Sequence, residues 1–72
     1  MNRNWSTIVN TINISRSLNN QISITYYNDG EQTAIGKITK IDNADHQLTL
    51  KHKQDFWVLQ YKYIIDASVI AS

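Results

Sequence analysis

The sequence predicts a mainly β protein, in which one N-terminal α-helix is followed by five short antiparallel strands that form a strongly bent small barrel. Two observations lead to this prediction. Apolar residues recur at helical spacing only at the start of the chain, whereas from Gln21 onward they alternate with polar residues in runs separated by turns. In addition, Gly36 stands alone inside an isoleucine-rich run, and a lone strand glycine marks a bend or bulge through which a short sheet curls.

The predicted helix covers residues 5–18. Its apolar residues fall at the three- and four-residue spacings of one helical face: Trp5, Ile8, Val9 and Ile12. Ser6 or Thr7 is expected to cap the N-terminus, with Trp5 ahead of the cap as a staple residue. Residues 18–21 form the predicted exit. Since many residues after Val9 are weak helix formers, we expect tertiary packing to stabilise this helix.

Five strand-like runs follow the helix. In the first, Ile22, Ile24 and Tyr26 occupy every second position, which is the pattern of a half-buried strand. Turn residues end this run, and Gly30 can take a positive φ there without steric cost. The predicted strands cover residues 21–27, 32–42, 48–50, 56–59 and 64–70, with turns at 28–31, 43–46, 51–55 and 61–63.

The second predicted strand carries isoleucines three residues apart, at Ile35, Ile38 and Ile41. A flat strand would place these side chains on alternating faces. We therefore expect a kink or bulge in this strand, marked by Gly36, that resets the register.

The composition fits a single domain spanning residues 1–72, with the helix and its exit loop at 1–20 and the barrel at 21–72. Hydrophobic residues make up 42% of the chain and charged residues 18%, which argues against a disordered chain. There is no cysteine for a disulfide and no Cys/His cluster for a structural zinc. Stability must therefore come from the packed core, from oligomerisation or from both. No cofactor is expected.

Localisation and charge narrow the class of protein further. The first residues contain no apolar run long enough for a signal peptide or a membrane span, and the lack of cysteine fits a reducing compartment. We therefore expect a cytoplasmic protein that does not bind membranes. The net charge of +1 provides no strong overall field for phosphate backbones or anionic lipid.

Three segments carry a resemblance to a known family: ITYYNDG at 24–30, IGKITKID at 35–42 and YIID at 63–66. Over residues 21–70 the chain resembles the YolD-like proteins of Gram-positive bacteria and their phages. That family is similar in turn to the Sm-like fold, an N-terminal helix followed by a bent five-stranded barrel. The resemblance implies this fold and a role as an accessory to a translesion DNA polymerase in the DNA-damage (SOS) response.

The Sm signatures are matched only in part. Gly36 and Asp42 stand at the spacing of the glycine and aspartate of the first signature, but His46 occupies the place of its base-contacting asparagine. Tyr61 and Lys62 stand where the second signature has an arginine–glycine pair. The resemblance therefore implies the fold without the residues through which Sm proteins contact RNA.

No constellation of catalytic or metal-binding residues is recognisable. Most carboxylates lie at predicted turns, and Asp42 is expected to accept backbone N–H bonds in its own turn. His46 and His52 are too few for zinc, which needs three or four protein ligands. No nucleophile–base pair is evident. We expect a non-enzymatic protein with no catalytic residues, no metal and no small-molecule substrate.

Lysines on neighbouring predicted strands form a candidate nucleic-acid site, for which Tyr27 or Tyr26 would supply a stacking face. Alternatively, strand lysines protect sheet edges and keep the domain soluble, since acidic residues are interspersed with them. The lysines concerned are Lys37, Lys40, Lys51 and Lys53.

Aromatic and apolar residues occupy both faces of the fourth predicted strand. Phe56 and Val58 point one way and Trp57 and Leu59 the other, whereas a barrel strand has one inward face. The second face is covered by the helix, by a neighbouring subunit or by a partner. The residues predicted to form a protein interface are Trp57, Leu59, Tyr61, Tyr63 and Ile65.

These surfaces lead to one favoured hypothesis and two alternatives. The favoured hypothesis is an interaction module that binds a protein partner, or a second copy of itself, through the last two strands. The alternatives are a nucleic-acid-binding Sm-like protein and a phage or mobile-element inhibitor that binds a host protein.

Overall fold

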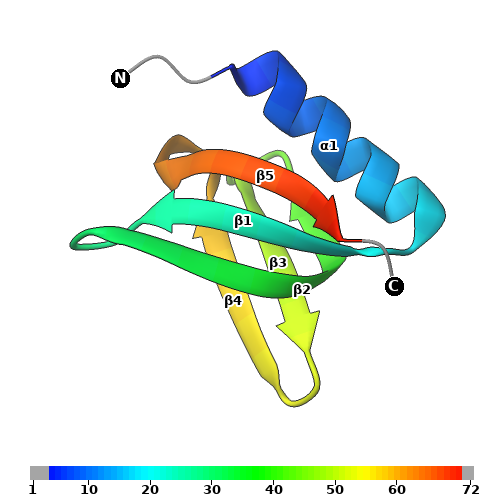
Figure 1. Ribbon diagram of the computed structural model, residues 1–72. Helices are drawn as coiled ribbons and strands as arrows, with labels where there is room; N and C mark the ends of the chain where they lie inside the picture. Colours follow the sequence, from blue (N-terminus) through cyan, green and yellow to red (C-terminus); the bar gives the residue numbers. More distant parts are fainter. Residues whose placement is uncertain (1–3, 71–72) are drawn as a thin grey trace.

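One helix and five antiparallel strands in a single sheet make up the structure, a computed structural model (Figure 1). It describes residues 4–70, so residues 1–3 and 71–72 of the predicted domain lie outside the described part. The predicted mainly β class, with one N-terminal helix followed by five antiparallel strands, is confirmed, but the sheet does not close into the predicted barrel. The elements are α1 (Trp5–Leu18), β1 (Gln21–Tyr27), β2 (Glu31–Asp42), β3 (Gln47–His52), β4 (Asp55–Gln60), the 3-10 helix η1 (Tyr61–Tyr63) and β5 (Ile64–Ile70).

The N-terminus of α1 is capped by Asn4, so the prediction of Ser6 or Thr7 as the cap is wrong. The Asn4 side-chain oxygen accepts a hydrogen bond from the Thr7 backbone N–H at 3.2 Å, as asparagine commonly does at this position. Trp5 is thereby the first helical residue rather than a staple ahead of the cap. Its ring packs against Tyr61 with the centroids 5.5 Å apart, so the first turn of the helix contacts η1.

The other end of α1 is closed by Asn19, which takes the left-handed conformation with a φ of 54°. The buried Ser15 donates a hydrogen bond from its hydroxyl to the Asn20 carbonyl at 2.9 Å and so holds the exit of the helix against the start of β1. Within residues 4–70, no helix has both the length and the apolar character needed to cross a membrane.

β2 takes part in both halves of the sheet, because its first part pairs with β1 and its second part with β3. At Gly36, an added Cβ would lie 2.6 Å from the carbonyl oxygen of Lys51, so glycine allows the end of β3 to approach this closely. Gly36 is therefore a site of close backbone approach, as a lone strand glycine predicts.

The predicted register shift in β2 is confirmed, and it lies a few residues beyond Gly36. The pairing with β3 shifts between Ile38 and Lys40. Because of this bulge, Ile38 and Ile41 both pack against the core, although three residues separate them. Ile35 precedes the bulge and remains 42% exposed.

The sheet has the strand order β4-β3-β2-β1-β5, and in residues 4–70 no strand pairing joins β4 to β5. The sheet is therefore strongly bent but not closed into a barrel. Figure 1 shows β3 and β4 crossing beneath β1 and β5, with α1 packed along β5. One hydrophobic core lies inside the bend: Ile8, Ile12, Ile22, Ile24, Ala34, Leu48, Leu50, Leu59 and Ile64.

Candidate functional site

The free edge of β4 presents unpaired backbone groups. The Tyr61 N–H donates to the His46 carbonyl at 2.8 Å. This hydrogen bond shows which residues of β4 direct their backbone groups toward β3. In an antiparallel ladder the bonded pairs alternate, so the backbone groups of Leu59 point toward Leu48 of β3, whereas those of Val58 and Gln60 point away from β3. Because β4 ends the strand order, these outward groups are available to a partner.

A groove of about 520 Å³ lies along this edge, between the end of β1 and the end of β4. Side chains from four parts of the chain line it, including both residues whose backbone groups point outward. The lining residues are Tyr26, Tyr27, Asn28, Asp29, Val58, Leu59, Gln60 and Tyr63. We call this site the edge groove. It combines hydrogen-bonding groups of a strand edge with an apolar and aromatic wall.

Three large side chains of the edge groove are unusually exposed for apolar or aromatic residues. Tyr27 is 56% exposed, Val58 52% and Tyr63 46%. The Lys62 ammonium lies over the Tyr63 ring, 5.1 Å from its centroid, which holds this lysine over the aromatic face. These residues form an accessible apolar surface of the kind that marks interaction sites.

The predicted orientation of the β4 side chains toward a partner is wrong for two residues. Leu59 is buried in the core, and Trp57 is half-buried against it. The reason is the pairing with β3, which places Trp57 opposite Leu50 and Leu59 opposite Leu48, both fully buried. The monomer itself covers this face, which is the alternative that the sequence left open.

The opposite side of β4 is the exposed one. Phe56 is 68% exposed and Val58 52% exposed, although neither was among the predicted interface residues. Of the predicted residues, Leu59 and Tyr63 line the edge groove. Ile65 is half-buried, next to the register irregularity between β1 and β5. Since both faces of β4 are apolar, only the pairing partner decides which one is inside.

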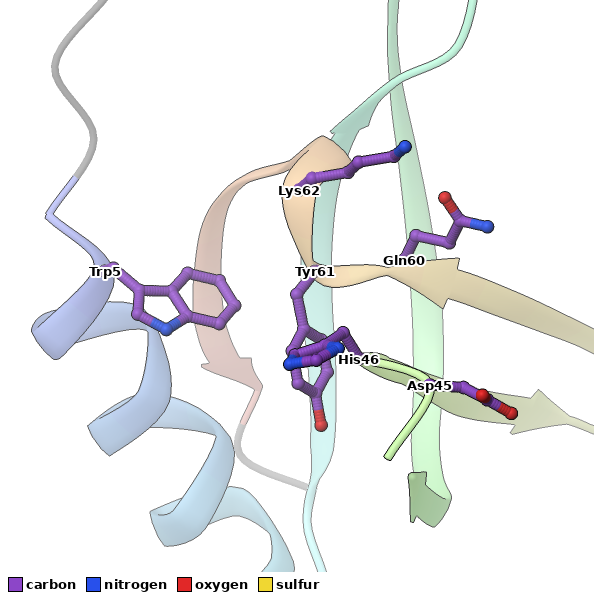
Figure 2. A pocket seen from close by; sticks show the side chains of 6 residues that line it. All are labelled: Trp5, Asp45, His46, Gln60, Tyr61 and Lys62. Atoms are coloured by element: carbon purple, nitrogen blue, oxygen red, sulfur yellow. The ribbon is translucent and has the colours of Figure 1, made fainter. Parts of the chain in front are cut away.

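Tyr61 is also turned inward, where it holds α1 onto the sheet. Its ring lies 5.5 Å from Trp5 and 6.2 Å from His46, the latter edge-on. Its hydroxyl donates to the Asn43 side-chain oxygen at 3.0 Å. Trp5, His46 and Tyr61 line a groove of about 560 Å³. Figure 2 shows these three side chains together, with the Asp45 carboxylate and the Lys62 ammonium pointing away from the Tyr61 ring. This arrangement stabilises the junction of α1 with the β2–β3 turn.

The pKa of the Tyr61 hydroxyl is raised above its ordinary value of 10.0, first by burial and second by the Asp42 carboxylate, against a smaller opposing effect of Arg16. The hydroxyl therefore stays protonated near neutral pH and acts as a hydrogen-bond donor. A raised pKa in the folded state means that this group stabilises the fold below pH 10 and that the contribution is lost as the pH rises through the raised pKa.

We expect Tyr61→Phe to lower the free energy of unfolding at neutral pH by about 1 kcal/mol, because it removes one hydrogen bond and keeps the ring contacts. Above pH 10, the wild-type protein should lose stability with rising pH more steeply than this variant. Urea denaturation at several pH values measures both effects. Equal pH dependence of the two proteins would contradict the role of the hydroxyl.

The candidate nucleic-acid lysines are brought together only in part. Lys37 and Lys51 are directly opposite each other across β2 and β3, and Lys40 follows on the same side of the sheet. Lys53 lies in the β3–β4 turn, where its φ is 57°. Tyr27, the predicted stacking residue, instead lines the edge groove, in which none of these lysines takes part. The aromatic residue that pairs with Lys51 is Phe56.

One carboxylate, that of Asp42, has a visible structural role. The Asp45 N–H donates to Asp42 Oδ1 at 3.0 Å, and this hydrogen bond lowers the pKa of the Asp42 carboxyl. The predicted role of Asp42 in its own turn is confirmed. Among the described residues, no group of three or more histidine, cysteine or carboxylate side chains is placed to hold a metal ion.

Comparisons of the chain with protein-family models, with curated proteins and with solved structures find no match in any of the three. The resemblance to YolD-like proteins therefore stays a prediction. The fold and the edge groove define residues 4–70 as a small helix-capped β domain with an accessible strand edge at β4.

Proposed function

We propose that this protein is a non-enzymatic interaction module that binds an extended segment of a partner polypeptide along the free edge of β4. The observation that supports this most strongly is the coincidence of two features in the edge groove. The outward backbone groups of Val58 and Gln60 lie in the same groove as the exposed rings of Tyr27 and Tyr63.

The mechanism is the addition of a sixth strand to the sheet. A partner segment would form backbone hydrogen bonds with Val58 and Gln60 and place alternate side chains between β4 and the tyrosines. Aromatic anchors in such sites each contribute about 2 kcal/mol or more of binding free energy. An extended polypeptide is the occupant that uses both the backbone groups and the apolar wall.

The resemblance supplies a candidate for the partner, a translesion DNA polymerase of the DNA-damage response. A host protein bound by a phage-encoded inhibitor would use the same surface, and so would a second copy of this chain. The edge groove supports a polypeptide partner in each case, and its geometry suits a narrow, extended segment.

A proline at position 58 is expected to abolish partner binding while leaving the monomer folded. The Val58 N–H points away from β3, so proline removes a hydrogen bond to the partner and none of the β3–β4 ladder. We expect an affinity loss of at least about tenfold, because both a backbone bond and an apolar contact disappear. Circular dichroism checks the fold.

The partner itself can be identified by photo-cross-linking from position 63, with position 14 on α1 as the control. Ile14 is 42% exposed, similar to Tyr63, but lies outside the edge groove. Adducts formed from position 63 and lost in the Val58→Pro variant support the proposal, and light scattering reports whether the partner is a second copy. Equal adducts from both positions, or binding unchanged by Val58→Pro, would reject it.

A further inference from the structure

The outer side of β2, β3 and β4, which faces away from the core, carries lysines beside an exposed phenylalanine. The strand pairing places Lys37 opposite Lys51, and Lys51 opposite Phe56, so the three residues form one row across three strands. Neighbouring strands lie about 4.8 Å apart, so the row is about 10 Å long. Phe56 is 68% exposed, the largest exposed fraction of any large apolar or aromatic side chain within residues 4–70.

Lys40 joins this row because of the β2 bulge. In a regular strand, Lys37 and Lys40 would point to opposite faces, since side chains alternate. The shift between Ile38 and Lys40 instead pairs Lys40 with Thr49, two residues from Lys51 on the same face. The bulge therefore puts Ile41 in the core and a third lysine on the outside. We call Lys37, Lys40, Lys51 and Phe56 the basic face.

Charge on the outer side of the sheet is unevenly distributed. Glu31 pairs with Tyr27 and Asp66 with Thr25, so these carboxylates lie on the part of the sheet made by β1, β5 and the start of β2. Asp42 lies on the same side of β2 as Lys40, two residues beyond it, and the two charges attract each other. Lys37 and Lys51 face each other directly, so positive charge is concentrated around this pair, although the net charge of the whole chain is only +1.

The row also places two like charges side by side. Lys37 and Lys51 are direct cross-strand partners, and like charges directly opposite each other destabilise a sheet. An anion bound between them removes this repulsion. A row of cations next to one exposed ring matches a single-stranded nucleic acid, whose phosphates bind lysine and whose unpaired bases stack on aromatic side chains.

We propose that the basic face binds single-stranded nucleic acid, with one base stacked on Phe56 and phosphates on Lys37, Lys40 and Lys51. Binding of this kind is tolerant of sequence, because a ring offers a stacking surface to every base. The site is separate from the edge groove, whose lining includes none of these four residues. The inference goes beyond the proposed function and does not depend on it.

Fluorescence anisotropy with labelled oligo(dT) and oligo(U) of about 20 nucleotides tests the proposal, since small β domains cover sites of about 4–16 nucleotides. We expect binding at low salt with a log–log salt slope of about −2, because three phosphate contacts on a single strand each contribute about −0.7. Lys37→Gln and Lys51→Gln should each reduce the slope by about 0.7. Phe56→Leu should weaken binding about fivefold while keeping an apolar side chain.

Lys62→Gln is the matched control, since Lys62 lies in η1 over the Tyr63 ring, outside the basic face. It removes the same charge and should leave the slope unchanged. A second readout separates function from folding: Lys37→Gln relieves the like-charge pair and should raise the melting temperature by about 2 °C while weakening binding.

Several outcomes would overturn the proposal. The first is that the protein does not bind the oligonucleotides at about 50 mM salt. The second is that Lys62→Gln and Lys51→Gln change the salt slope equally, and the third is that duplex and single-stranded oligonucleotides bind with equal affinity. Binding to phosphatidylserine vesicles without binding to oligonucleotides would also overturn it and would assign the basic face to a lipid surface. Retained oligonucleotide binding by Val58→Pro would show that the two sites are independent.

Discussion

Replacing Gly36 by alanine is expected to destabilise the fold by about 1–3 kcal/mol, and replacing it by valine by more, enough to leave much of the protein unfolded. The added Cβ would lie 2.6 Å from the carbonyl oxygen and 2.9 Å from the carbonyl carbon of Lys51. These are backbone atoms of β3, so they can move away only if the whole end of that strand moves. The cost therefore exceeds the small gain in chain entropy from losing a glycine.

Urea denaturation followed by tryptophan fluorescence measures this effect, and Ile35→Ala is the matched control. Ile35 precedes Gly36 in β2 but is 42% exposed, so its truncation should cost under about 1 kcal/mol. If Gly36→Ala is as stable as the wild-type protein, β3 does not approach β2 as closely as the structure indicates.

Trp57→Ala and Phe56→Ala, one residue apart on β4, are expected to lower the stability of the fold by very different amounts. Trp57 packs half-buried against the core, and its truncation should cost about 2–4 kcal/mol, somewhat less than for a fully buried tryptophan. Phe56 is 68% exposed, and its truncation should cost under about 0.5 kcal/mol. The first variant tests the core, whereas the second removes only a surface ring.

Thermal and urea denaturation of both variants provide the comparison, with the wild-type protein measured in parallel. A stable Trp57→Ala variant together with an unfolded Phe56→Ala variant would show that β4 is turned the other way. In that case the two faces of the sheet would exchange roles, and both the edge groove and the basic face would have to be reassigned.

Much of the fold could be predicted from the sequence because its signals are local. Helical spacing between Trp5 and Ile12, alternation in β1 and the turn residues around Gly30 gave each element its type and approximate position. The helix cap was harder to place, because Asn4, Ser6 and Thr7 all qualify as caps. The structure has Asn4 as the cap, whose side-chain oxygen accepts a hydrogen bond from the Thr7 N–H, and local sequence does not distinguish it from the other two.

The sequence could not predict which side of β4 faces the core, because the residues on both sides of this strand are apolar. Its register with β3 decides the matter by placing Trp57 and Leu59 against buried leucines. The edge groove was missed for a related reason, since Tyr27 and Val58 come together only through the bend of the whole sheet. No local sequence pattern predicts that these two residues lie close together.

Part of the expected clustering of lysines is found, where the pairing joins strands that are neighbours in the chain, whereas nucleic-acid binding by these lysines stays a prediction. Lys37 and Lys51 face each other as adjacent hairpin strands would place them. The aromatic residue beside the lysines is not the predicted one. Tyr27 lies in the edge groove, and Phe56 is the aromatic residue that pairs with Lys51. The sequence predicts which lysines lie on neighbouring strands, but the register between β3 and β4 determines which aromatic residue lies next to them.

The packing of α1 along β5 limits how this domain can assemble. Unlimited fibre growth requires two complementary edges on every molecule, so that each addition creates the next attachment point. Here β4 forms one edge of the sheet, and β5, with α1 packed along it, forms the other. If α1 blocks strand pairing at β5, docking of one partner strand at β4 occupies the remaining edge, and we expect complexes of fixed stoichiometry instead of polymers.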